Sequence, residues 1–309
     1  MEVIETKQAF RQACQDAQDR GLAVGFVPTM GALHQGHGRL IKAARDQTGF
    51  VAMSIFVNPL QFGPTEDLSK YPRDLAKDLG IAKSLGVEVV FTPTQEEMYP
   101  NGDPAVTVDP GPLGDRLEGA SRPGHFRGVL TVVAKLFDLA GPCRAYFGEK
   151  DAQQLALVRR MAADLDFPVE VVACPTVREL DGVALSSRNG YLSPEERRAA
   201  PVLFEALSAA AAAVRQGERR GDALRALMAR SIGAEPLARL DYVAVVEDDT
   251  WDDVTALTGP ARALVAVRIG PARLIDNLAL PWEAGFAAGE SVQNRPEAWS
   301  SDPSSEGSS

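Results

Sequence analysis

Cysteine and histidine are scarce in this chain, with three of each among 309 residues. Cys14, Cys143 and Cys174 are an odd number, lie far apart and form no Cys-x-x-Cys pair. These features argue against a disulfide framework and against a zinc knuckle. We interpret all three as buried or incidental thiols.

The chain also lacks a surplus of positive charge and any long apolar run. Its 32 lysines and arginines face 42 acidic residues, for a formal net charge of -10. A nucleic-acid partner is therefore not expected, because phosphate backbones demand a basic face. No apolar run approaches the roughly 20 residues that span a bilayer, so no membrane partner is expected. The first 20 residues lack the features of a secretory signal, which favours a cytoplasmic protein.

Apolar runs alternate with amphipathic stretches through the first 175 residues. The runs that predict buried strands are Leu22–Val27, Phe50–Val57, Val87–Phe91, Arg144–Phe147 and Val169–Cys174. Between two of them, apolar residues from Phe126 to Phe137 recur at helical spacing. Such alternation predicts an α/β fold with a doubly wound parallel sheet, in which ligands bind beyond the carboxyl ends of the strands.

The sequence pattern changes after residue 175, which predicts a second, smaller α+β domain over residues 176–281. We expect one alanine-rich helix from Ser193 to about Gln216 and another over Gly221–Ile232. Asp241–Val246 and Ala261–Ile269 alternate like strands of a small antiparallel sheet. Residues 282–309 are rich in Ser, Pro and Glu, and we expect a disordered tail there.

The segment PTMGALHQGHGRL, residues 28–40, places two of the three histidines where a strand gives way to a helix. A glycine turn before a helix start leaves free backbone N–H groups and the positive end of a dipole, where an anion could sit. His34 and His37 would face one side of the first helical turn, and each could donate to a phosphate. The alternative is that both are only turn or capping residues. Zinc is disfavoured, because helical zinc sites space their histidines four apart.

A second block, GEKDAQQL, again ends a predicted strand in a glycine and opens a helix. Lys150 is either a phosphate contact or a solvated surface charge. Asp151 either caps the helix or binds Mg²⁺. Gln154, which can both donate and accept, suits a substrate that carries hydroxyl groups.

Two further loops carry polar side chains after predicted strands or turns. Ser186, Ser187 and Arg188 form a polar run between two turn signals, which by itself is only a polar loop. A buried strand runs into Asn58-Pro59 and a loop that carries Gln61.

Taken together, these segments resemble the pantothenate synthetases, or pantoate–β-alanine ligases. The shared segments are MGALHQGH, FVNPLQF, RPGHFRGVLTVV, GEKDAQQL and PTVRELDGVALSSRNGYL. The resemblance covers about residues 1 to 281. The His-x-Gly-His element alone also occurs in the wider superfamily of nucleotidylyltransferases and class I aminoacyl-tRNA synthetases, whereas the five segments jointly are specific.

The resemblance implies a Rossmann-like amino-terminal domain, residues 1–175, that binds ATP and pantoate, and a carboxy-terminal lid, residues 176–281, in a homodimer. It also implies condensation of pantoate with β-alanine, using ATP and Mg²⁺, through a pantoyl adenylate, with release of AMP and pyrophosphate. The positions that match the family's ATP site are Met30, Gly31, Ala32, Leu33, His34, Gln35, Gly36, His37, Gly148, Glu149, Lys150, Asp151, Val177, Leu185, Ser186, Ser187 and Arg188.

The same matches imply the roles of individual residues. His37 corresponds to the histidine usually assigned as proton donor. The other groups that would stabilise the transferring phosphoryl group and the departing pyrophosphate are His34, Lys150, Ser186, Ser187 and Arg188. Gln61 and Gln154 match the glutamines that hold pantoate, and Gln61 is also near the site of the amine.

Two other functions stay open at this point. A nucleotidylyltransferase would give Gln61 and Gln154 no evident role, and a non-catalytic nucleotide-binding protein would not need two histidines, Lys150 and Arg188. The chain departs from the family at four positions, which commonly hold Glu, a leucine-like residue, an aromatic residue and Met. These positions are Gln35, Gly38, Ala152 and Leu185.

Overall fold

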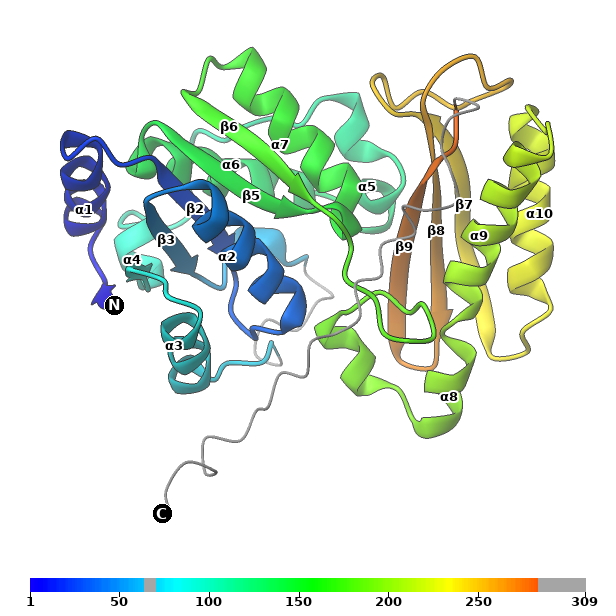
Figure 1. The fold of residues 1–309 in the computed structure, drawn as a ribbon, viewed down its shortest axis with the longest axis horizontal. Helices are drawn as coiled ribbons and strands as arrows, with labels where there is room; N and C mark the ends of the chain where they lie inside the picture. Colours follow the sequence, from blue (N-terminus) through cyan, green and yellow to red (C-terminus); the bar gives the residue numbers. More distant parts are fainter. Residues whose placement is uncertain (64–70, 283–309) are drawn as a thin grey trace. The chain divides into compact units, whose positions relative to one another are not determined.

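The structure of this chain is a computed structural model that describes residues 1–63 and 71–282. These residues form two compact units, which divide between Thr176 and Val177 (Figure 1). Most of the predicted tail, residues 283–309, lies outside the described residues. Trp282 was assigned to that tail, and this assignment is wrong, because its half-buried side chain packs against the core of the second unit.

The first unit is built on a six-stranded sheet in which all neighbouring strands are parallel. In spatial order the strands are β1 (Glu2–Ile4), β4 (Val89–Phe91), β3 (Phe50–Ile55), β2 (Val24–Thr29), β5 (Cys143–Gly148) and β6 (Val169–Cys174). The predicted α/β fold with a doubly wound sheet is therefore confirmed. The sequence reasoning missed β1, because three residues are too few to show a pattern.

Helices connect these strands and cover the sheet. The longer ones are α1 (Lys7–Asp19), α2 (Gln35–Gln47), α3 (Leu75–Ser84), α6 (His125–Ala140) and α7 (Ala152–Asp164). The shorter helices and turns are η1 (Pro59–Gln61), α4 (Gln95–Met98), η3 (Pro112–Asp115), α5 (Glu118–Ser121) and η4 (Glu149–Asp151). The predicted helix with apolar residues from Phe126 to Phe137 is confirmed as α6, which packs between α1 and α7.

The direction of strand order reverses between β2 and β5, and these two strands part toward their carboxyl ends. They pair only at Gly25 with Arg144 and at Phe26 with Ala145. Beyond these pairs β2 continues to Thr29 and β5 to Gly148. A reversal of this kind is where open α/β sheets bind ligands. The segments that follow β2 and β5 are those that contain His34 and Lys150.

The second unit is an antiparallel three-stranded sheet covered by helices. Its elements are η5 (Ser187–Tyr191), α8 (Pro194–Ala199), α9 (Val202–Arg215), α10 (Gly221–Gly233), β7 (Ala238–Glu247), β8 (Ala261–Ile269) and β9 (Ala272–Leu280). The apolar faces of α9 and α10 pack on the sheet and enclose a second hydrophobic core. The sequence reasoning missed β9.

The single helix that was predicted from Ser193 to about Gln216 is wrong, since α8 ends at Ala199 and α9 begins at Val202. Pro201 lies between them, and a proline has no N–H to continue the helical hydrogen bonds. The three cysteines are free and buried, as predicted. Among the described residues, no helix combines the length and apolar character of a membrane span.

Candidate active site

His34 and His37 lie where the turn after β2 becomes helix α2. His34 is the N-cap of α2, and its Nδ1 accepts the backbone N–H of Gly36 at 3.1 Å. His37 reaches back, so that its Nδ1 accepts the backbone N–H of His34 at 3.3 Å. The two ring centroids are 4.2 Å apart. Both histidines therefore act as capping residues, and both rings have a fixed orientation.

The same hydrogen bonds determine which ring nitrogen carries the proton. A backbone N–H can only donate, so Nδ1 of each ring is unprotonated, and the neutral imidazole then has its proton on Nε2. Burial is the main cause that lowers the pKa of His34 to about 4 and of His37 to about 3. The charge of Lys150 lowers both pKa values further, and that of Asp151 opposes it. Near neutral pH the site holds two neutral Nε2–H donors.

The expectation of free backbone amides is wrong for three residues of the turn before His34. The N–H of Gly31 donates to Thr29 Oγ1 at 3.2 Å. The N–H groups of Ala32 and Leu33 donate to the two carboxylate oxygens of Asp78, at 2.9 and 2.8 Å. Because these amides already have partners, the imidazoles are the better donors to an anion. The side chain of Leu33 belongs to the hydrophobic core of the unit.

Lys150 and Asp151 occupy η4, directly after β5, and both act electrostatically on the histidines. The Lys150 side chain is only 16% exposed, so it is not a solvated surface charge. Its Nζ is 3.7 Å from Asp151 Oδ1. Asp151 stands at the N-cap position of α7, but its side chain makes no capping hydrogen bond. The structure thus brings His34, His37, Lys150 and Asp151 together.

Gln61 ends η1 after β3, and its main chain is held firmly. Its backbone oxygen accepts from His125 Nδ1 at 2.9 Å and from an Arg122 Nη at 3.2 Å. The side chain is buried, yet its Oε1 has no hydrogen-bond partner among the described residues. A buried oxygen without a partner is costly. A bound molecule that donates a hydrogen bond would satisfy it.

The segment around Gln61 packs against the start of α6 without a gap. Asn58 Nδ2 donates to the backbone oxygen of Gly128, and Tyr99 Oη donates to Asn58 Oδ1. A Cβ atom at Gly128 would collide with the backbone oxygen of Leu60. Only glycine allows this approach, so the start of α6 fixes the position of η1.

The two adjacent glutamines of α7 differ in their surroundings. Gln153 is buried, donates to the backbone oxygens of Leu113 and Arg116, and accepts the N–H of Glu118, so it joins α7 to the η3–α5 segment. Gln154, the predicted pantoate residue, is half-buried.

The remaining predicted residues of the first unit lie on the same two connections. Those around the turn and the start of α2 are Met30, Gly31, Ala32, Gln35 and Gly36, and those at the end of β5 are Gly148 and Glu149.

The predicted residues beyond Thr176 belong to the second unit. Val177 and Leu185 pair at the base of a short hairpin, where the Leu185 N–H donates to the Val177 oxygen at 2.9 Å. Ser186 follows and caps η5 by accepting the N–H of Arg188 at 3.2 Å. Ser187 and Arg188 are exposed. That these residues act on the same ligand as His34 stays a prediction.

The hairpin is anchored by an arginine that the sequence reasoning passed over. Arg178 makes two hydrogen bonds to the buried carboxylate of Asp276 in β9, at 2.6 and 3.0 Å. Its guanidinium also donates to the Gly182 oxygen at the hairpin tip and lies over the ring of Phe204. Asn189 ties the following loop back by donating to the Ala184 oxygen.

No cluster of three or more His, Cys, Asp or Glu side chains in the described ranges could hold a metal ion by itself. Mg²⁺ often binds through one or two carboxylates together with substrate phosphates. The carboxylate of Asp151, 49% exposed and without a capping role, fits such a site.

The chain matches the model of a protein family described as pantoate-beta-alanine ligase over residues 2–279. It belongs to this family. The chain is therefore a ligase that joins pantoate and β-alanine through a C–N bond, and the predicted resemblance is confirmed.

Relatives of known name and solved structure agree with membership in the pantoate-beta-alanine ligase family. The pantothenate synthetases of Roseiflexus castenholzii and Moorella thermoacetica are 56% and 51% identical to this chain over 280 residues. Each match covers 91% of this chain and 99% of the relative. A crystal structure of the Thermus thermophilus enzyme has a TM-score of 0.84 at 50% identity, and covers 91% of this chain and 100% of that one.

A crystal structure of the pantoate-beta-alanine ligase of Francisella tularensis, complexed with beta-gamma ATP and beta-alanine, has a TM-score of 0.72 at 34% identity. That match covers 90% of this chain and 97% of the relative.

Proposed function

We propose that this chain forms pantothenate in two steps, with ATP as the activating substrate. In the first step an oxygen of the pantoate carboxylate attacks the α-phosphorus of ATP. The bond between that phosphorus and the bridging oxygen breaks, and pyrophosphate leaves a pantoyl adenylate. In the second step the amine of β-alanine attacks the acyl carbon, a C–N bond forms, AMP departs with the C–O electron pair, and the amine loses a proton. The complex of the Francisella tularensis relative supports both the nucleotide and the amine.

The observation that carries this proposal is the pair of neutral Nε2–H donors at His34 and His37, beside the largely buried cation of Lys150. The first step brings together two anions, so the barrier falls mainly through positioning and fixed donors. His34 and Lys150 would bind the phosphates, and His37 would donate to the oxygen that gains charge. The loss of one such donor typically raises a barrier by about 3 to 4 kcal/mol.

Gln61 and Gln154 would hold pantoate. The buried Oε1 of Gln61, without a partner among the described residues, would accept from a pantoate hydroxyl, and later lie near the incoming amine. Because η1 follows β3 while the histidines follow β2, pantoate would lie beside the phosphates along one edge of the sheet. Exclusion of water there would protect the adenylate from hydrolysis.

The carboxylate of Asp151 would hold Mg²⁺ together with ATP phosphates. The ion would neutralise charge on the departing pyrophosphate. Residues 1–175 would form the domain that binds ATP and pantoate, and residues 176–281 a lid. That lid would contribute Ser186, Ser187 and Arg188 to the phosphates, with Val177 and Leu185 beside the nucleotide. We also propose a cytoplasmic homodimer, as in the family.

The test is the exchange of labelled pyrophosphate into ATP without β-alanine, which reports the first step alone. We expect exchange that requires pantoate and Mg²⁺, and release of AMP only after β-alanine is added. His34→Asn keeps a favoured N-cap residue but removes the imidazole, and Lys150→Met removes the charge. Both should lower exchange by at least about a hundredfold.

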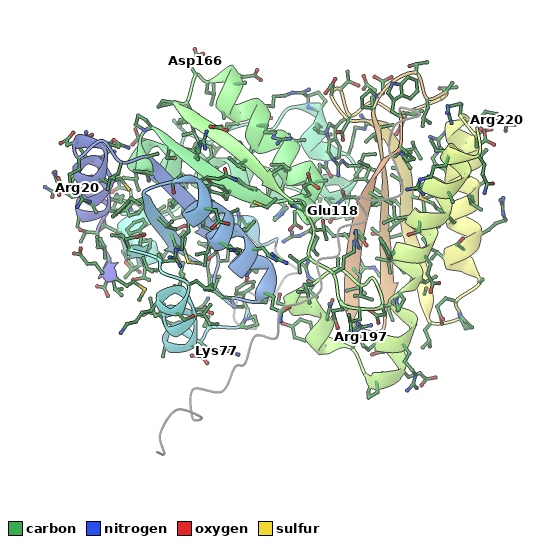
Figure 2. The ribbon with its side chains drawn as sticks, viewed as in Figure 1. Arg20, Lys77, Glu118, Asp166, Arg197 and Arg220 are labelled. Carbon is green, nitrogen blue, oxygen red and sulfur yellow. The ribbon has the colours of Figure 1, made fainter. Side chains whose placement is uncertain are left out.

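Lys77→Met is the matched control for Lys150→Met, because Lys77 is exposed on α3 (Figure 2). It should exchange at the wild-type rate. Exchange that proceeds without pantoate, or that His34→Asn leaves unchanged, would contradict the proposal.

A further inference from the structure

The turn that leads into His34 has a backbone conformation that needs an external support. Gly31 and Ala32 have φ angles of 83° and 52°, in the left-handed region. Glycine adopts this region readily, but alanine does so only at a cost. Such a conformation persists only where surrounding contacts hold it.

Asp78 supplies that support from a distant part of the chain. It lies in the first turn of α3, and its residue is only 2% exposed. Oδ2 accepts the N–H of Ala32 at 2.9 Å, and Oδ1 accepts the N–H of Leu33 at 2.8 Å. Each oxygen takes a different amide, so the carboxylate holds two consecutive peptide units at once. A Cβ atom at Gly31 would lie 2.8 Å from Oδ2, so a larger residue there would displace the carboxylate.

The hydrogen bonds continue from this carboxylate to the histidines. Leu33, held by Asp78, is followed directly by His34, whose N–H donates to His37 Nδ1. A rotation of the turn would therefore move the N-cap and reorient both rings. Thr29 steadies the other end of the turn, since its Oγ1 accepts from Gly31 and donates to the Ser54 oxygen.

We infer that Asp78 is a positioning residue, which holds the Gly31–Leu33 turn and so directs the Nε2–H groups of His34 and His37. The inference rests on the proposed function and adds a residue to it. A carboxylate suits this position because it only accepts, and the start of α3 favours its charge. An asparagine would offer one acceptor and turn an N–H₂ group toward an amide N–H.

The experiment compares Asp78→Asn with Asp74→Ala. Asp74 is the exposed N-cap of the same helix, and its carboxylate accepts from Lys77 N–H but does not contact the turn. Asp74→Ala should lower the melting temperature and leave the kcat of pantoate-dependent exchange unchanged. Asp78→Asn should lower that kcat at least about tenfold, because catalytic groups tolerate little misplacement. Its KM for pantoate should stay within about twofold, since Gln61 is held by other contacts.

A spectroscopic measurement separates positioning from mere stability. The chain has three histidines, so a ¹⁵N-histidine-labelled sample gives few signals, and His125 serves as an internal reference. In Asp78→Asn the ring signals of His34 and His37 should shift while those of His125 stay. If Asp78→Asn does not fold, Asp78→Glu, with two acceptors set one methylene further out, should show the same shifts and the same loss of kcat.

The outcomes also separate this inference from the proposed function. If the wild-type protein shows no pantoate-dependent exchange, the proposed function fails. If the wild type exchanges normally, and the Asp78 variants keep both its kcat and its histidine signals, only the role of Asp78 is overturned.

Discussion

The close approach of α6 to η1 allows a sharp test of how Gln61 is positioned. In Gly128→Ala the new Cβ would collide with the Leu60 oxygen and lie 2.9 Å from the Gln61 nitrogen. A carbon and a carbonyl oxygen ordinarily stay about 3.3 Å or more apart. Both neighbours are main-chain atoms and no side chain can turn aside, so η1 must move by on the order of 1 Å.

The displacement of η1 lowers the free energy of unfolding, whereas the replacement of a glycine within a helix raises it. Overpacking of this kind typically costs about 1 to 3 kcal/mol. Replacement of a helical glycine by alanine stabilises the fold by up to about 1 kcal/mol. Gly80→Ala in α3 gives that gain alone, because a Cβ there would have nothing within 4 Å. The difference in unfolding free energy between the two variants therefore measures the collision, at about 1 to 3 kcal/mol.

The functional consequence follows from the Gln61 main chain. A displacement of about 1 Å can cost up to a hundredfold in a catalytic site. We expect the KM for pantoate to rise at least about tenfold in Gly128→Ala. The KM for ATP should change little, because the turn at His34 is held from α3. Steady-state exchange with each substrate varied in turn measures both constants. A wild-type KM for pantoate, in a variant that has lost the expected stability, would refute the link between α6 and substrate binding.

Two further predictions concern charge. ¹⁵N spectra should show His34 and His37 neutral and protonated on Nε2 from pH 8 down to about pH 5, because folding lowers both pKa values from 6.5. Below pH 6.5 these two rings therefore bind more protons in the unfolded chain than in the folded protein. Their contribution to the free energy of unfolding is complete above pH 6.5, and it is lost as the pH falls toward 4 for His34 and toward 3 for His37. A ring that titrates near pH 6.5 would disprove the assignment of its proton to Nε2. Asp276→Ala should destabilise the second unit by about 3 to 5 kcal/mol, because it leaves a largely buried guanidinium unpaired. Asp222→Ala, which breaks an exposed pair with Arg220 (Figure 2), should cost far less, and equal shifts in melting temperature would contradict this reasoning.

The fold of the first unit could be predicted because its information is local. Five of its six strands are mainly apolar, as expected of a parallel sheet, although Arg144 interrupts β5 and Glu170 interrupts the edge strand β6. In the second unit, Pro201 interrupts a stretch whose alanines all favour helix, and the predicted helix ran through it. The alanines on either side favour helix, but proline cannot donate the backbone hydrogen bond that a continuous helix needs.

The site could be predicted only in part, because part of it depends on contacts between distant residues. His34, Lys150 and Gln61 stand in recognisable segments after three neighbouring strands. Asp78 has no such signal, since it is one of two aspartates in YPRDLAKDL, and only the fold brings it to the turn at Ala32. Arg178 looks like an ordinary surface charge until β9 places Asp276 beside it.

The two interpretations of the histidine pair, capping or phosphate binding, are not alternatives. The backbone N–H groups that His34 and His37 accept at Nδ1 are what fix each proton on Nε2. An imidazolium could not accept these bonds, so the same contacts that begin the helix also keep the rings neutral. Neutral donors held by the backbone need no reorganisation when charge develops on a phosphoryl group. They also avoid placing two further cations beside Lys150, where mutual repulsion would work against binding. The helix start thus produces the kind of donor that the proposed reaction requires.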